Sequence, residues 1–276
     1  MVNVNTPAAI TTQPTAAAVC TDKVTSFTAA ATGSAITHNW RVQTVTGGAW
    51  ADVADGGVYS GSKTGTLVIT APPVSMNGYS YKDSVSTTPC AAAVSNAVKL
   101  TVNPLPTINL SVAPYRKLFP GLLTTITAAV TPAAATYTWL RNGATVANAT
   151  SASLLVDVNG LGDYSLRVTD VNGCNSTSVI VSITDSASGK FFIYPNPNNG
   201  LFQVRYYSAA GNVNLPRGIN VYDARGKRVL VQNYSISTPF ARMDVDLRSF
   251  GSGVYWLELV DMNGNRLATG RAEVLR

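Results

Sequence analysis

The feature that most constrains how this 276-residue chain folds is a segment that can lie in neither a helix nor a central strand. Residues 194–200 read Tyr194-Pro195-Asn196-Pro197-Asn198-Asn199-Gly200. Each proline fixes φ, lacks an N–H donor and restricts the residue before it, and the Asn-Asn-Gly end tolerates the positive φ of a sharp turn. In residues 201–207, Phe202, Val204 and Tyr206 then alternate with other side chains, as they would in a strand. We therefore expect a new domain to begin at this segment.

The composition predicts an all-β chain. Thr, Val, Ala, Ser, Gly and Asn are abundant and only 12% of the residues are charged, which favours short strands and turns over helices. No stretch has the pattern and caps of an amphipathic helix, and no apolar run is long enough to cross a bilayer. The length predicts two or three domains. From the order of motifs along the chain we expect three tandem β-sandwiches, in residues 1–103, 104–185 and 186–276.

The net charge of +6 is distributed unevenly. Residues 1–103 have a net charge of +1, residues 104–188 of 0 and residues 189–276 of +5, with nine arginines in the last range. Arginine-rich surfaces can bind nucleic acid, but these arginines are scattered without a helix or a base-stacking aromatic pattern. We expect no nucleic-acid partner. An acidic partner and a solvated face that binds nothing both stay open.

Residues 1–103 are expected to form an immunoglobulin-like sandwich. The candidate strands are residues 24–31, 36–43, 50–53, 66–70, 79–86 and 93–102. Trp40 occupies the place of the buried strand-C tryptophan of such folds, and Tyr81 fits the tyrosine-corner position. Asp83 stands where a vertebrate domain has its second core cysteine, so the usual bridge between the sheets is not expected.

The three cysteines predict one disulfide. Cys20 precedes strand B (residues 24–31) and Cys90 follows strand F (residues 79–86), so we expect both at one end of the sandwich and joined to each other. Closing a loop of roughly seventy residues stabilises by about 4 kcal/mol on the chain-entropy model, and the bond needs an oxidising compartment. The alternative is two free buried thiols. Cys174 has no evident partner in its domain and is expected to be free.

A second sandwich, immunoglobulin-like or polycystic-kidney-disease-like, is expected in residues 104–185. Trp139 is its candidate strand-C tryptophan, and Asn142-Gly143 predicts a hairpin turn. Residues 162–173 align without gaps on residues 253–264. The side chains expected to face the two cores are Tyr164, Leu166 and Val168 in the first copy, and Tyr255, Leu257 and Leu259 in the second. We ascribe this similarity to the structural requirements of a β-sandwich and not to a shared function.

Three places near the end of the chain carry a resemblance to a known family. They are residues 194–200, the hairpin of residues 219–229, and residues 253–264 followed by Arg271 in the last expected strand. Together they are similar to the type A C-terminal sorting domain of proteins exported by the type IX secretion system of Bacteroidota. The matching motif residues are Tyr194, Pro195, Asn196, Pro197, Gly200, Gly253, Tyr255, Gly264 and Arg271. The family commonly has lysine where Arg271 stands, and Trp256 is bulky for its position.

The resemblance implies a β-sandwich that acts as an export signal. Its partners would be the type IX translocon and associated outer-membrane or surface proteins, and anionic lipopolysaccharide after processing. The route would lead through periplasm and outer membrane to the cell surface or the medium. The family's sorting domain is often removed near its start, which predicts a cut between Thr184 and Phe192. Residues 47–50, 59–61 and 75–81 resemble immunoglobulin-like repeats of large Bacteroidota surface proteins, so the first two sandwiches are expected to be spacer or adhesive modules.

An exported protein of this kind needs a signal peptide. Residues 1–7 lack the basic and apolar regions of one. We therefore expect this chain to be the C-terminal piece of a longer protein, with Met1 added or internal.

The residues supply no evident catalytic, cofactor or metal site, so we expect no enzyme activity. His38 is the only histidine, and it lies beside Asn39 and Trp40 without a serine-elbow sequence. One histidine and three dispersed cysteines do not make a metal site. Residues 261–265 lack the closing glutamate of a calcium loop and read as a hairpin turn.

Trp256 is the one residue that suggests a contact site. It alternates with Tyr255, so it is expected on the outer face with Glu258, either as an anchor for a secretion partner or covered by a neighbour. Two other functions stay open. A carbohydrate-binding surface protein would use Trp50 or Trp256 as a sugar platform, and a secreted enzyme would have its catalytic domain upstream of this non-catalytic tail.

Overall fold

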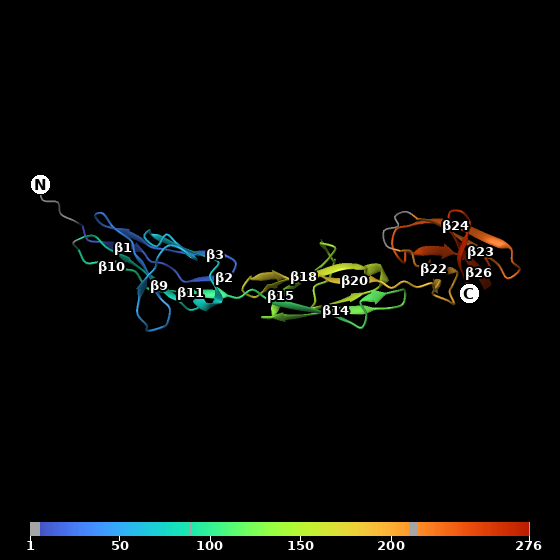
Figure 1. The fold of residues 1–276 in the computed structure, drawn as a ribbon, viewed down its shortest axis with the longest axis horizontal. Coiled ribbons are helices and arrows are strands. Elements are labelled where there is room, and N and C mark those ends of the chain that lie inside the picture. The colour runs from blue at the N-terminus through green and yellow to red at the C-terminus, as the bar shows by residue number, and fades with distance from the viewer. Residues whose placement is uncertain (1–5, 89, 210–214, 276) are drawn as a thin grey trace. The chain divides into compact units, whose positions relative to one another are not determined.

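The computed structural model describes residues 6–88, 90–209 and 215–275, and nearly all of its regular structure is strand (Figure 1). In these ranges the helical elements are two short 3₁₀ turns, η1 (Val74–Met76) and η2 (Val158–Gly160). The prediction of an all-β fold is confirmed. Within the same ranges, no helix has the length and apolarity to span a membrane. Met1, to which the expectation about the start of the chain refers, lies outside the described residues.

Internal packing groups the chain into two compact units. The first consists of Met1–Ile108, Val130–Tyr137 and Arg167–Thr177, and the second of Asn109–Ala129, Thr138–Leu166 and Ser178–Arg276. The boundaries expected at residues 103 and 185 stay predictions.

The first sheets lie in residues 9–103. Their strands are β1 (Ala9–Thr12), β2 (Ala17–Cys20), β3 (Val24–Thr28), β4 (Ala30–Thr32), β5 (Trp40–Gln43), β6 (Ala51–Asp52), β7 (Tyr59–Ser60), β8 (Thr66–Thr70), β9 (Ser80–Val85), β10 (Ala93–Val94) and β11 (Val98–Asn103). The sheet β2-β11-β9-β5-β6, with β10 beside β9, accompanies the sheet β3-β8-β7 and the pair β1-β4. Alternating apolar residues fill the core, with Phe27, Leu67 and Leu100 almost fully buried.

The strand-C tryptophan is where the sequence predicts it, whereas the tyrosine corner is not. Trp40 is fully buried and its Nε1 donates to the carbonyl of Thr64 at 2.9 Å. Tyr81 is also fully buried, but its hydroxyl bonds the hydroxyl of Tyr59 at 2.9 Å and not an upstream carbonyl. Burial raises the pKa of Tyr81 above its ordinary value. The two tyrosines therefore form a polar link inside the sandwich.

The predicted Cys20–Cys90 disulfide is wrong. Cys20 is bonded to Cys174, with 5.6 Å between the Cα atoms, and Cys90 is free. Cys20 ends β2 opposite Asn103, the last residue of β11. Strand β9 runs antiparallel to β11, so Cys90, which follows β9, lies at the other end of the sheet. The prediction failed because strands B and F run in the same direction, which places the start of one and the end of the other at opposite ends.

The middle sheets lie in residues 107–185. Their strands are β12 (Thr107–Ala113), β13 (Lys117–Leu118), β14 (Thr124–Thr131), β15 (Ala134–Arg141), β16 (Ala144–Thr145), β17 (Ser153–Val156), β18 (Gly162–Asp170), β19 (Asn175–Thr177) and β20 (Val181–Asp185). One sheet has the order β12-β14-β17, and the other β13-β20-β18-β15-β16 with β19 beside β18. Trp139 is fully buried, as predicted. Asn142 and Gly143 have φ of 51° and 81° and form the predicted hairpin turn.

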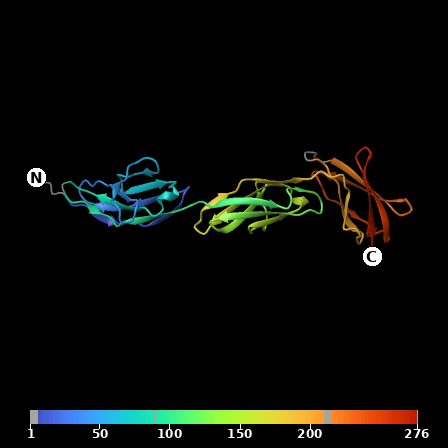
Figure 2. The same ribbon diagram turned by 60° about the horizontal axis from the view of Figure 1, so that its bottom comes forward.

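The C-terminal sheets form a sandwich. Their strands are β21 (Phe192–Tyr194), β22 (Leu201–Arg205), β23 (Leu215–Tyr222), β24 (Arg228–Ile236), β25 (Met243–Asp246), β26 (Gly253–Val260) and β27 (Arg266–Val274). The sheet β21-β22-β25 and the sheet β24-β23-β26-β27 enclose one apolar core. Phe202 and Val245 reach this core from the first sheet, and Ile219 and Leu257 from the second. Figure 2 shows these strands, in orange to red, from a second side.

Candidate functional site

The segment of residues 194–200 is attached to the last strand by two asparagines. Asn196 Nδ2 donates to the carbonyl of Arg271, and the N–H of Glu273 donates to Asn196 Oδ1, both at 2.8 Å. The backbone of Asn198 continues the pairing, since it donates to the carbonyl of Glu273 at 2.9 Å and accepts from the N–H of Leu275 at 2.8 Å. The segment thus covers the outer edge of the final part of β27.

The turn that follows is built for glycine. Asn198 is buried, and its Oδ1 accepts from the N–H of Gly200 at 2.8 Å. Gly200 has a φ of +99°, and a Cβ there would lie 3.1 Å from the Cα of Arg248. Its carbonyl accepts from the N–H of Leu247 at 2.6 Å. Because of both the φ and the close approach, a larger residue cannot replace Gly200 without a shift of the backbone.

The start of β26 lies beside the end of β27. Gly253, with a φ of +152°, pairs with Val274. Tyr255 is buried, and its hydroxyl donates to the carbonyl of Gly251 at 2.6 Å, which makes a tyrosine corner. Gly264 lies in the turn at the other end of β26. The structure therefore brings the predicted motif residues together, except for Gly264.

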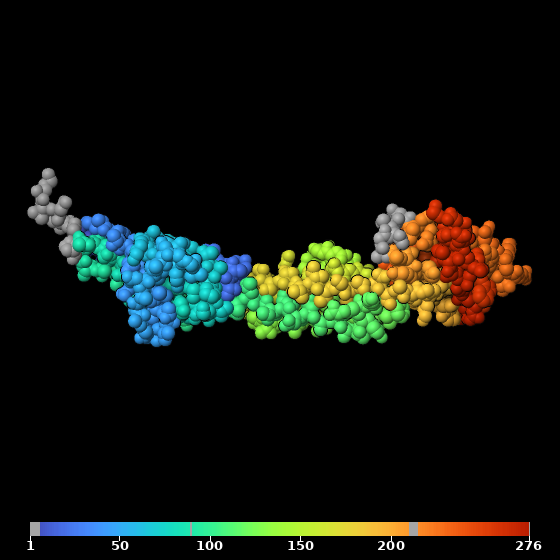
Figure 3. All heavy atoms as spheres, viewed as in Figure 1, coloured from blue at the N-terminus to red at the C-terminus, as the bar shows by residue number. Residues whose placement is uncertain are grey.

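Trp256 lies on the outer face of the four-stranded sheet and is 54% exposed. It pairs with Tyr222 on one side and Arg271 on the other, and Tyr222 pairs with Arg228, so that two aromatic residues lie between two arginines. Figure 3 shows the red strands at the end of the chain open to the viewer. Among the described residues, no ring contact or cation–π contact of Trp256 is present.

Glu258 on the same face is already engaged. Its Oε2 accepts from the hydroxyl of Tyr222 at 3.0 Å, and its Oε1 lies 3.7 Å from Arg266. This carboxylate raises the pKa of Tyr222, because it accepts a hydrogen bond from the protonated phenol and repels the phenolate. The face thus combines aromatic and arginine side chains with one neutralised acid.

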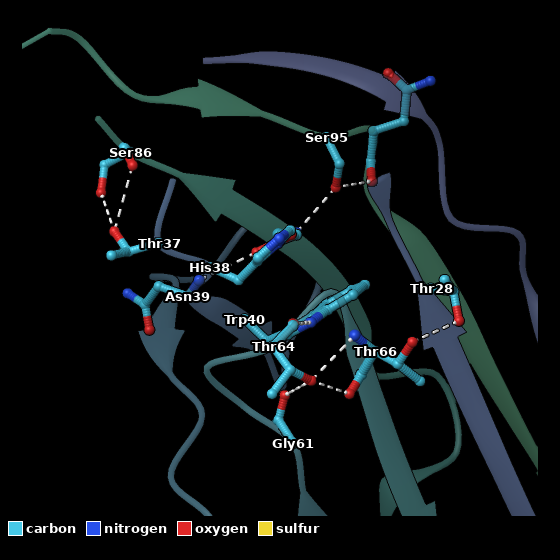
Figure 4. A network of polar contacts seen from close by, with 12 residues as sticks. Thr28, Thr37, His38, Asn39, Trp40, Gly61, Thr64, Thr66, Ser86 and Ser95 are labelled. Carbon is cyan, nitrogen blue, oxygen red and sulfur yellow. Dashed lines mark hydrogen bonds and ion pairs between the residues drawn. The ribbon is translucent and has the colours of Figure 1, made fainter. Parts of the chain in front are cut away.

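His38 belongs to a structural network in the first sandwich (Figure 4). Its Nδ1 lies 2.6 Å from Oδ2 of the fully buried Asp83, whose Oδ1 accepts from the N–H of Asn39 at 3.1 Å. The N–H of Asp83 donates to Ser95 Oγ, and this hydroxyl donates to the carbonyl of Asn96. The serine therefore bonds backbone groups and not the imidazole. In the described part of the chain, no group of three or more His, Cys, Asp or Glu side chains could hold a metal ion.

Two further sequence hypotheses concern Trp50 and the turn of residues 261–265. Lys82 Nζ lies 4.1 Å from the ring centroid of Trp50, so one face of this ring is occupied. Asp261 Oδ1 accepts from the N–H groups of Asn263 and Asn265, both at 2.8 Å. The hydrogen bonds from Asn265 lower the pKa of Asp261. The segment is the hairpin turn that the sequence predicts.

Sequence reasoning missed the partners of two residues in this region. The pairing of Asn196 and Asn198 with β27 joins positions far apart in the chain, and no local pattern announces it. Arg205 alternates with the apolar Val204 and Tyr206 in the sequence, yet it is 4% exposed. Its position directly after the alternating Phe202 and Val204 gives no signal of that burial, because alternation predicts the face of a strand and not what covers its end.

Comparisons with known proteins support the C-terminal assignment. Residues 192–269 match the family model of the secretion system C-terminal sorting domain. No curated protein matches the sequence.

Among solved structures, the I-band fragment I67–I69 of titin matches 97% of this chain and 98% of its own at 12% identity, with a TM-score of 0.41. Sidekick-1 immunoglobulin domains 1–5 match 99% of this chain and 59% of their own at 12% identity and a TM-score of 0.38. The four N-terminal immunoglobulin domains of Dscam1 isoform 7.44 match 66% of this chain at 14% identity and a TM-score of 0.36. This chain spans 46% of that Dscam1 structure.

The resemblance inferred from the motif residues is thus confirmed for the C-terminal sheets. Residues 192–269 correspond to a secretion system C-terminal sorting domain, which marks the chain as a protein exported to the cell surface or secreted.

Proposed function

We propose that residues 194–200 together with β26 and β27 form the surface that the type IX secretion machinery recognises, through binding alone. The observation that carries this proposal is the attachment of Asn196 and Asn198 to β27. This attachment joins the first and last parts of the domain. A receptor would therefore bind a sandwich in which residues 194–200 are paired with β27. Trp256 and Arg271 lie on adjacent strands of the same sheet and supply the exposed aromatic and basic contacts.

The experiment uses the whole chain behind a periplasmic leader, in a bacterium that has the type IX system. We expect the wild-type protein outside the cell and the double variant Asn196→Ala, Asn198→Ala retained in the periplasm. Asn233→Ala, at an exposed asparagine of β24, is the matched control and should be exported normally. Normal export of a double variant whose closure on β27 is lost, as measured by hydrogen exchange of Glu273 and Leu275, would contradict the proposal.

Removal of the sorting domain is a further part of this proposal. Strand β20 ends at Asp185 and β21 begins at Phe192, so residues 186–191 lie outside the strands and are open to a protease. We expect a cut between Thr184 and Phe192, followed by attachment of the cargo to anionic lipopolysaccharide. Mass spectrometry of the mature surface protein tests this. A mature C-terminus beyond residue 200 contradicts it.

The first two sandwiches act as spacer or adhesive modules in this account. Their succession of sheets suits a spacer. A carbohydrate-binding function is favoured only by the exposed ring of Trp256, since Lys82 covers one face of Trp50. A glycan array would distinguish the two, because a spacer binds no glycan. A role as the non-catalytic tail of a secreted enzyme depends on what the full gene encodes upstream.

A further inference from the structure

Strand β24 is one outer edge of the four-stranded sheet in the C-terminal sandwich. It pairs with β23 along its whole length, and among the described residues no other strand or loop bonds to the backbone of Val229–Ile236. In an antiparallel pair, the N–H and C=O groups of an edge strand point alternately toward and away from the partner. This nine-residue strand therefore presents a row of unpaired donors and acceptors, which another extended backbone can match.

The other edges of this sandwich are covered or short. Strand β27, at the opposite edge of the same sheet, contains Arg266 and Arg271 and is paired with residues 196–198. The edge strands of the other sheet, β21 and β25, have three and four residues. Natural sheets prevent edge-to-edge pairing by short strands, charges, proline and covering segments. Val229–Ile236 has no charged residue and no proline, so the long edge of β24 lacks these protections.

The side chains of β24 also leave apolar surface at this edge. Leu230 and Tyr234 pack against the core of the sandwich but are only half-buried. Val231 lies on the outer face, where it pairs with Asn220, and is 52% exposed. A further strand at this edge would remove part of this apolar surface from water, which favours association.

A second copy of β24 is complementary to this edge. Antiparallel pairing centred on Gln232 aligns all nine residues and sets Leu230 opposite the partner's Tyr234. Cross-strand pairs of aliphatic and aromatic side chains stabilise antiparallel sheets. The one charged residue, Arg228, lies opposite the partner's Ile236, and the two arginines are about 27 Å apart at about 3.4 Å per residue. No like charges therefore face each other across the pair.

We propose that two copies of this chain associate through antiparallel pairing of their β24 strands about Gln232. The two four-stranded sheets then form one continuous sheet around a two-fold axis. A single pair of strands buries less surface than the roughly 1,200 Å² of a stable interface, so the dimer is weak and concentration-dependent. The pairing leaves β27 and residues 194–200 free, and it does not depend on the proposed function.

Sedimentation velocity of the whole chain over a range of concentrations tests the proposal. The Cys90→Ser background is used, so that the free thiol cannot cross-link two copies. We expect a reversible monomer–dimer equilibrium with a Kd on the order of 100 µM. Hydrogen exchange at low and high concentration should show added protection in residues 229–235 and none in β27.

Two charge variants locate the contact. Gln232→Lys and Gln232→Glu each place like charges opposite each other at the two-fold axis, and each should weaken dimerisation about fivefold or more. An equimolar mixture of the two variants should dimerise again, because lysine then faces glutamate. Thr269→Lys, which adds the same charge to an exposed position of β27, should dimerise like wild type.

The outcomes separate self-association from other uses of the edge. A chain that stays monomeric at all concentrations would overturn the proposal and leave the edge to an extended segment of another protein. A dimer that both Gln232 variants form with wild-type affinity would overturn it as well. If these variants do not fold, hydrogen exchange of the unaltered β24 decides, since concentration-dependent protection elsewhere but not in residues 229–235 contradicts the pairing.

Discussion

Strands β18 and β26 have the same local structure in two different sandwiches. Each starts at a glycine with φ near +150°, 149° at Gly162 and 152° at Gly253. In each, the tyrosine two residues later donates its hydroxyl to a carbonyl four residues upstream, from Tyr164 to Gly160 and from Tyr255 to Gly251. The following side chains alternate between core and surface, which the sequence alignment of the two stretches predicts.

The turns after the two strands are also alike. Asp170 Oδ1 accepts from the N–H groups two and four residues later, and Asp261 Oδ1 does the same. A third copy follows β23, where Asp223 Oδ1 accepts from Arg225 and Lys227. The glycines of these turns have φ between 77° and 82°, which the bulged three-residue hairpin loop requires. The sequence Asp-x-x-Gly is therefore a structural signal and not a metal loop.

The two copies differ in what they present outside this shared frame. Where β26 places the exposed Trp256, the aligned residue of β18 is Ser165. Where the second turn ends in Asn265, the first ends in Cys174, which is bonded to Cys20. The shared strand and turn thus determine the local fold of both copies. Single positions differ between them: Cys174 forms a covalent link in the first copy, and Trp256 is an exposed aromatic side chain in the second.

The largest effect should come from the cysteine that only the first copy has. Cys174→Ser opens a link between residues 154 positions apart, which on the chain-entropy model contributes up to about 5 kcal/mol to the free energy of unfolding. Urea unfolding without reductant measures it, with Cys90→Ser as the control that should change little. An equal loss in both variants, or a Cys20–Cys90 peptide in a non-reducing digest, would contradict the assignment.

The next largest effect is expected from the two buried leucines that the strands share, and it separates a role in stability from a role in export. Leu166 and Leu257 occupy aligned positions and are 0% and 1% exposed. Leu166→Ala and Leu257→Ala should each lower the free energy of unfolding by about 2–5 kcal/mol, since each leaves a cavity. Only Leu257→Ala should also reduce the exported fraction of the chain. If both variants block export equally, export depends on overall stability and not on the C-terminal sandwich.

The tyrosine corners should contribute less and nearly equally. Tyr164→Phe and Tyr255→Phe each remove one hydrogen bond to a backbone carbonyl, which costs about 1 kcal/mol. Chemical unfolding of the two variants measures this. A cost confined to one of them would show that the two corners are not equivalent.

The smallest expected effect is the contribution of Asp261 to stability at low pH. The folded-state pKa of Asp261 lies below its ordinary value of 3.8, because Asn265 and the turn amides favour the carboxylate. The resulting stability is present above pH 3.8 and is lost as the pH falls through the lowered folded pKa. Asp261→Asn should therefore show a smaller drop in Tm between pH 5 and pH 2 than wild type. The same drop in Tm in Asp261→Asn and wild type would show that the carboxylate of Asp261 does not contribute to stability in acid.

The sequence predicts the parts of this molecule that depend on neighbours in the chain. Alternation predicts the buried sides of β18 and β26, and Asn142-Gly143 predicts its turn, because local geometry decides both. The partner of Cys20 was not predictable in this way, since alternation gives the face of a strand but not the end at which its neighbours finish. The pairing of Asn196 with β27 and the burial of Arg205 likewise arise from distant segments, for which the sequence carries no local pattern.

The most direct test compares the two sandwiches as export signals. Residues 186–276 and residues 104–185 are each fused to a fluorescent protein behind a periplasmic leader, in a bacterium with the type IX system. The account predicts that the first fusion appears outside the cell and the second remains in the periplasm. Retention of the first fusion, in cells that still export their own cargo, or release of both fusions alike, would contradict it.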